Sequence, residues 1–88
     1  MAEIIKMFYV YLIRSTIDNS LYIGQSENIE ERLNRHNAGF VASTKNKRPW
    51  VLVGFEEYPT RELARWREYK LKKNAGEKKK FINKLMSS

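Results

Sequence analysis

The stretch MFYVYLIRSTIDNSLYIGQS, residues 7–26, decides the fold of this chain. Residues 7–14 and 21–26 are rich in aromatic and β-branched side chains, which favour β-strands. Between them, Asp18-Asn19-Ser20 offers turn chemistry, because Asp and Asn tolerate positive φ and bond their own backbone. The stretch therefore predicts a β-hairpin with tyrosines on both strands.

The middle of the chain predicts one helix and one more strand. Asn28 is a good N-cap for a helix over about 29–38, and Gly39 ends that helix. Residues 40–48 are polar and basic and predict an exposed loop. Residues 50–58 are nearly continuous in apolar side chains, a pattern typical of a strand that is buried on both faces.

The last third of the chain predicts two helices. Thr60 suits the N-cap of a helix that runs to about residue 73. Residues 74–76 interrupt this helix, and a short basic helix follows at about 77–86.

Together these elements fit one small domain with a thin core. A chain of 88 residues buries only somewhat more than ~60% of the surface that its unfolded form exposes. We therefore expect a single domain over residues 1–88, with its core at about 7–73. The expected fold class is α+β: a small three-stranded antiparallel sheet flanked by helices, in the order β-β-α-β-α-α.

The composition excludes several classes of protein and favours a polyanionic partner. There is no cysteine for a disulfide or a thiolate metal site, and no apolar run approaches the ~20 residues of a membrane span. The N-terminus lacks a signal-peptide pattern, so we expect a cytoplasmic protein that binds no membrane. The net charge is +7, and residues 61–88 carry all of it, with ten basic and three acidic residues. Such a surface suits nucleic acid, although a solvated lysine-rich helix would have the same composition.

The first predicted helix turns an arginine and a histidine toward the protein body. At about 100° per residue, Ile29, Leu33, His36 and Phe40 share one stripe, and Arg32 lies at its edge. A charged arginine there needs an anionic partner or loses solvation. Two interpretations stay open: a structural pair, with the arginine on a carboxylate and the histidine on a carbonyl, or groups that stabilise phosphate charge and move protons.

The second predicted helix places a carboxylate beside its buried face. Leu63, Ala64 and Leu71 form an apolar stripe that includes Arg67, and Glu68 lies at its border. A carboxylate in this position could hold Mg²⁺, which often takes one or two carboxylates plus phosphate and water. The structural alternative is an ion pair with a neighbouring cation, and the residues alone favour it.

The tyrosines of the hairpin depend on its register. Tyr9 and Tyr11 share one face of the first strand. A connection with an even number of residues puts Tyr22 on that face, and an odd number puts it on the other. A phenol with a pKa near 10 is a poor base at neutral pH, and a nearby cation such as Arg32 would lower that pKa.

At this point the chain resembles the GIY-YIG nuclease domain, in particular its small stand-alone bacterial branch. The second motif is intact as Tyr22-Ile23-Gly24, and the first is similar as Tyr9-Val10-Tyr11. The arginine, histidine and glutamate of the family match Arg32, His36 and Glu68 in order and interval. The resemblance covers residues from about 7 to 73.

The resemblance implies a metal-dependent endonuclease that hydrolyses phosphodiester bonds with one Mg²⁺ (or Mn²⁺) ion. It implies that Tyr11 or Tyr22 activates water or orients the attack, that Arg32 stabilises phosphate charge, and that His36 assists proton transfer. Glu68 would hold the metal. Without a separate DNA-reading domain, we expect weak sequence specificity or recognition of DNA structure.

The expected partner is nucleic acid, DNA rather than RNA, with room for a protein partner that supplies targeting. The cations expected to contact backbone phosphates are Lys45, Lys47, Arg48, Arg67, Lys70, Lys72 and Lys73. The alternative function is a catalytically silent DNA- or RNA-binding module, or an accessory subunit of another nuclease.

Overall fold

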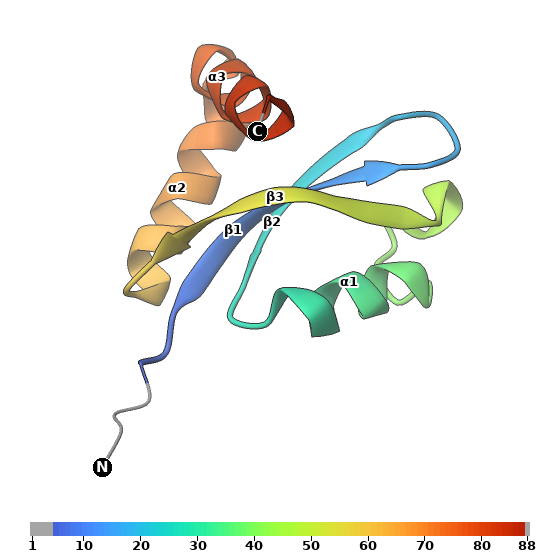
Figure 1. Cartoon of the computed structure of the whole chain (residues 1–88), viewed down its shortest axis with the longest axis horizontal. Coiled ribbons are helices and arrows are strands. Elements are labelled where there is room, and N and C mark those ends of the chain that lie inside the picture. Colours follow the sequence, from blue (N-terminus) through green and yellow to red (C-terminus); the bar gives the residue numbers. More distant parts are fainter. Residues whose placement is uncertain (1–4, 88) are drawn as a thin grey trace.

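The computed structural model of the chain describes residues 5–87 and confirms the predicted α+β fold in the order β-β-α-β-α-α. The bounds are β1 Phe8–Ser15, β2 Leu21–Ser26, α1 Ile29–Asn37, β3 Trp50–Tyr58, α2 Arg61–Lys73 and α3 Ala75–Met86, with a 3-10 turn, η1, at Lys45–Lys47. The strands form one antiparallel sheet in the order β2-β1-β3, so β1 is central (Figure 1). The N-terminal residues that lack a signal-peptide pattern lie partly outside the described part.

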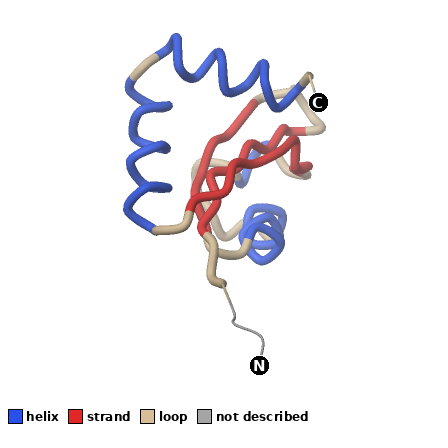
Figure 2. The backbone as a smooth tube through the Cα atoms, turned by 60° about the vertical axis from the view of Figure 1, so that its left-hand side comes forward, coloured by secondary structure: helices blue, strands red, loops and turns tan. Residues whose placement is uncertain are grey.

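Helices cover both faces of the sheet and divide its core in two. Figure 2 shows α2 and α3 as an L-shaped pair around one face, with α1 against the other. The larger core, under α2 and α3, consists of Val10, Leu12, Ile23, Ala64, Leu71, Phe81 and Leu85. The smaller core, under α1, is built on Tyr11, Ile13 and Trp50, with Tyr22, Ile29 and Leu33 packed against it. Alternate residues of β1 therefore supply alternate cores.

The hairpin register places both motif tyrosines on the α1 face. Arg14 pairs with Leu21, so residues 15–20 form an even connection of six. Asn19 adopts a positive φ of 63° in this turn, as expected for its residue type. As a result Tyr11 lies opposite Gly24. Tyr22 is two residues from Gly24 on β2, so its side chain lies on the same face of the sheet as Tyr11.

The third strand differs from its prediction. Val51, Leu52 and Phe55 are 38%, 39% and 42% exposed, so the expected burial on both faces is wrong. In a sheet of three strands only the central strand is covered throughout, and that strand is β1, whereas β3 is an edge. Its apolar run lies partly beyond the reach of the helices.

The helix ends follow their capping residues. The side chains of Asn28 and Thr60 accept hydrogen bonds from backbone N–H groups of α1 and α2, as predicted. Asn74 caps α3 in the same way, so α3 begins at Ala75, two residues earlier than expected, and contains Gly76.

Two side chains that were expected on buried stripes are exposed. Phe40 is 74% exposed, because α1 ends at Asn37 and Gly39, with a φ of 85°, turns the chain away. Leu63 is 46% exposed on the flank of α2. Over residues 5–87 no helix combines the length and the apolar character required to cross a membrane.

Candidate active site

The centre of the site is the phenol of Tyr11, which lies across Gly24 of the neighbouring strand. A Cβ atom at Gly24 would overlap the hydroxyl and ring of Tyr11. The absence of a side chain at Gly24 is what lets the phenol cross β2 toward the edge of the sheet. Gly24 of the second tyrosine motif therefore leaves the space that Tyr11 of the first motif occupies.

A chain of hydrogen bonds runs inward from this hydroxyl. The Oη atom of Tyr11 lies 2.9 Å from Nε2 of His36, and Nδ1 of His36 lies 2.8 Å from Oγ1 of Thr44. The Thr44 hydroxyl donates to the carbonyl of Val41 at 3.3 Å, so it accepts the proton on Nδ1. We assign the tautomer from this network: Nε2 carries no proton and accepts the Tyr11 O–H.

Burial sets the protonation states of Tyr11 and His36. His36 is 1% exposed and Tyr11 is 2% exposed. Burial raises the pKa of Tyr11 well above its ordinary value; Tyr22 and Glu68 add to the rise, and Arg32 opposes it. Burial also lowers the pKa of His36, and Arg32 lowers it further. At neutral pH the phenol is therefore protonated and the imidazole is neutral. Arg32 lowers the pKa of Tyr11, as its charge predicts, but desolvation outweighs it.

Tyr22 and Glu68 join the same site from β2 and α2. The ring of Tyr22 packs edge-on against His36, with 5.0 Å between centroids. The Nζ atom of Lys72 lies 5.6 Å from the centre of the Tyr22 ring and 3.0 Å from Oε2 of Glu68. The Glu68 ion pair expected as the structural alternative is thus present, and it holds the carboxylate beside the tyrosines.

Among residues 5–87 Arg32 has no carboxylate partner, unlike the structural pair that the sequence left open. Together with Arg35 and Arg61, and with the carboxylates of Glu27 and Glu31, it lines a polar hollow of about 160 Å³. Among residues 5–87, the guanidinium groups of Arg32 and Arg35 form no hydrogen bond or ion pair, whereas Arg61 binds Glu27 at 3.1 Å. Unpaired guanidinium groups in a polar hollow are suited to bind a phosphate.

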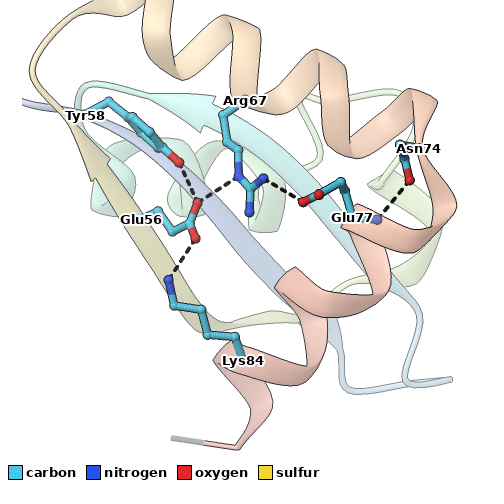
Figure 3. A network of polar contacts seen from close by, with 6 residues as sticks. All are labelled: Glu56, Tyr58, Arg67, Asn74, Glu77 and Lys84. Atoms are coloured by element: carbon cyan, nitrogen blue, oxygen red, sulfur yellow. Dashed lines mark hydrogen bonds and ion pairs between the residues drawn. The ribbon is translucent and has the colours of Figure 1, made fainter.

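The other predicted phosphate contacts divide into free and engaged cations. Arg67 donates to Glu56 at 3.0 Å and to Glu77 at 3.2 Å, and its side chain is 19% exposed (Figure 3). These two ion pairs tie Arg67 to β3 and α3, away from solvent, and leave it no freedom to bind a phosphate. Lys47 lies 3.6 Å from Asp18, but its side chain remains 48% exposed.

The remaining cations lie on η1 and its flank and along α2. Arg48 donates to the carbonyl of Lys45 at 2.7 Å. Lys70 and Lys73 belong to the last turn of α2, beyond Glu68. One group of these exposed cations lies at η1 and the other lies on α2, so they do not form a single cluster.

Glu68 is the residue that could hold a metal ion. Within the described residues no three His, Cys, Asp or Glu side chains cluster as a metal cage. One carboxylate fits Mg²⁺ or Mn²⁺, whose remaining ligands are water and substrate phosphate, and does not fit an ion enclosed by protein ligands. The side chain of Glu68 is 22% exposed, so an ion bound there would also be open to substrate.

Thr44 is the member of the site that the sequence did not indicate. It lies in the segment predicted as an exposed loop, yet it is 0% exposed. The segment is anchored by Trp50, whose Nε1 donates to the carbonyl of Thr44 at 2.9 Å, and Asn37 holds the Trp50 backbone. The available signal was the inward histidine itself, because a buried imidazole needs a partner for each nitrogen.

Comparison with known proteins shows the family of this chain. The family model of the GIY-YIG catalytic domain matches residues 7–81. A UPF0213 protein of Staphylococcus haemolyticus is 46% identical over 65 residues, which cover 73% of this chain and 78% of that protein. UPF0213 proteins of Haloquadratum walsbyi and Pediococcus pentosaceus are 41% and 39% identical, over 84% and 92% of this chain and 83% and 86% of their own lengths. The chain therefore belongs to the GIY-YIG family of nuclease domains.

Proposed function

We propose that this chain is a metal-dependent endonuclease that hydrolyses phosphodiester bonds in DNA, with weak sequence preference or with recognition of DNA structure. The observation that carries the proposal is the Tyr11 hydroxyl, hydrogen-bonded to a neutral, buried His36 beside the unpaired Arg32. A purely structural site would pair the arginine and would have no use for this line of proton donors and acceptors.

In this proposal Tyr11 and His36 act together as the base. The raised pKa of Tyr11 prevents the phenol from losing its proton unaided. In this arrangement the attacking water contacts the phenol and not the imidazole, whose Nε2 accepts the phenolic proton. As water attacks phosphorus, one of its protons passes to the Tyr11 oxygen while the phenolic proton passes to Nε2. Thr44 keeps the ring in the orientation that this transfer requires. Tyr22 packs edge-on against His36 and so lies next to this pair.

Arg32 stabilises the negative charge that develops on the phosphate. Arg32 lines the polar hollow and, within residues 5–87, has no ion pair that must first be broken. Donors that need no rearrangement contribute most to a transition state. Arg35 and Arg61 line the same hollow, together with the carboxylates of Glu27 and Glu31, and Arg61 is paired with Glu27.

Glu68 would hold the divalent ion, which when bound supplies Lewis-acid stabilisation of the phosphate and the leaving oxygen. Lys72 keeps the Glu68 carboxylate at the edge of the sheet, beside Tyr22. Among the described residues no three His, Cys, Asp or Glu side chains group to hold an ion, so its other ligands would be water and phosphate.

Cleavage of defined DNA tests the proposal. Purified protein is incubated with single-stranded, duplex and branched DNA, with RNA in parallel, in Mg²⁺ or Mn²⁺ and in EDTA. We expect cutting that needs the ion and that Glu68→Ala abolishes, while Glu30→Ala, which removes an exposed carboxylate of α1, keeps it. Cutting by Glu68→Ala equal to that of the native chain would contradict the metal assignment and indicate a contaminant.

A second candidate is a silent nucleic-acid-binding module or accessory subunit, targeted by a protein partner. The deep burial of Tyr11 and the existing Glu68–Lys72 ion pair favour it, because both restrict access to the site. Binding without cutting on every substrate would support this candidate. Under either proposal affinity falls steeply with salt, because it rests on phosphate contacts.

A further inference from the structure

Two aromatic rings are exposed on α2 and stacked on each other. Trp66 is 58% exposed and Tyr69 is 53% exposed. Their ring centroids lie 5.7 Å apart, with 16° between the ring planes. They take no part in either core cluster, so their large apolar surface is not explained by the packing of the fold.

The pair lies on the flank of α2 that continues from Glu68. At about 100° per residue, Lys72 and Arg65 follow about 40° and 60° beyond Glu68, and Tyr69 and Trp66 follow at about 100° and 160°. The opposite flank belongs to Arg67, which is closed by its ion pairs to β3 and α3 (Figure 3). A strand that leaves the site over Lys72 therefore meets the aromatic pair next.

The charges around the pair are complementary to a polyanion. The Nζ atom of Lys73 lies 5.9 Å from the centre of the Tyr69 ring. A shallow hollow beside the rings is lined by Glu62, Arg65, Trp66 and Tyr69. Cations next to exposed ring faces are the features that bind single-stranded nucleic acid, with phosphates on the cations and bases on the rings.

We propose that the Trp66–Tyr69 pair is a stacking platform for an unpaired base, and that the substrate class is DNA with a single-stranded segment beside the cleaved bond. Bases within a duplex have both faces covered by their neighbours, so they have no face to offer. The inference rests on the proposed function for the position of the cut, but the platform itself binds without metal.

Intrinsic fluorescence tests the platform independently of catalysis. The chain has two tryptophans, and Trp50 is 3% exposed, so a stacked base affects mainly Trp66. In EDTA, titration with a single-stranded 12-nucleotide DNA should quench the emission and saturate, whereas the matched duplex should quench it little. Trp66→Phe should lose the quench yet keep the same melting temperature.

Affinity supplies the second measurement. By fluorescence anisotropy of labelled single-stranded DNA, Trp66→Ala should weaken binding about tenfold, within the range for one stacked base. Phe40→Ala, which removes another exposed aromatic ring, is the control and should bind as the native chain does. Unchanged affinity in Trp66→Ala, or equal quenching by duplex, overturns the platform even if the chain cuts DNA.

The result remains informative if the chain cuts nothing. Quenching by single strands in EDTA with no cleavage in Mg²⁺ supports the platform and removes the endonuclease proposal. A native dimer that Trp66→Ala converts to a monomer in analytical ultracentrifugation, with no loss of DNA affinity, would assign the pair to a second copy of the chain and overturn the inference.

Discussion

The two faces of the sheet use similar residues in opposite ways. On the α2–α3 face, Arg67 is bound by Glu56 and Glu77, and Lys84 donates to Glu56 at 3.0 Å (Figure 3). On the α1 face, Arg32 acts on the neutral rings of Tyr11 and His36 and has no carboxylate partner among residues 5–87. Paired charges hold elements together, whereas an unpaired charge beside proton-transfer groups is available for a substrate. Arginine alone therefore does not reveal its role; its partners do.

The first and largest effect should come from Tyr11→Phe. This change keeps the ring over Gly24 and removes only the hydroxyl that contacts His36. We expect the single-turnover cleavage rate to fall about 10²- to 10⁴-fold, the usual contribution of a general base. The free energy of unfolding should fall by about 1–3 kcal/mol, because the ring packing remains but the buried Nε2 of His36 loses its donor. Cleavage by Tyr11→Phe at the native rate would contradict the role of Tyr11 as the base and would favour Tyr22 in that role.

Replacing each of the two arginines with alanine in turn tests this comparison. Arg32→Ala should lower the cleavage rate about 10²- to 10³-fold, because it removes a donor to developing phosphate charge. Arg67→Ala should instead destabilise the fold by about 2–3 kcal/mol, since it leaves Glu56 and Glu77 without their shared partner. Urea unfolding and cleavage at a temperature where both variants are folded separate the effects. A large stability loss in Arg32→Ala would contradict the distinction.

The loss of folding stability at acid pH should depend on Glu56. Burial opposes its charge, but hydrogen bonds from Tyr58, Lys84 and Arg67 outweigh it and lower the pKa of Glu56. A carboxyl group whose pKa is lower in the folded state stabilises the fold at any pH above its unfolded pKa of about 4.5. This stabilisation is lost as the pH falls through the folded pKa. Glu56→Gln should cost about 2 kcal/mol at pH 7 and flatten this dependence. Identical acid unfolding curves for the native and variant chains would count against the pairing.

The smallest effect should come from Thr44→Val. It removes the acceptor of the Nδ1 proton and frees the His36 ring to change tautomer. We expect about a tenfold loss of cleavage rate, because Thr44 acts only by orienting the ring that accepts the proton. The native rate should hold below pH 6.5 before it declines in acid, because burial lowers the pKa of His36 and only the neutral ring accepts a proton. A decline centred at or above pH 6.5 would contradict the buried neutral ring.

Much of this fold follows from local sequence. The hairpin, the caps at Asn28 and Thr60, and the element order depend on residues within a few positions of one another, and all were confirmed. The apolar run of β3 did not reveal that this strand is an edge. The same kind of error placed Thr44 in an exposed loop, because burial of a loop depends on what packs over it.

By itself the sequence determined which groups exist and at what intervals: two tyrosines on a hairpin, an arginine and a histidine one helical turn apart, and a glutamate on the next helix. Only the tertiary structure decided the hydrogen-bond chain from Tyr11 through His36 to Thr44, and the pairing that occupies Arg67 and leaves Arg32 free. Capping and strand preference act over a few residues. Hydrogen bonds, ion pairs and desolvation depend on distances between segments far apart in the chain, which exist only after folding.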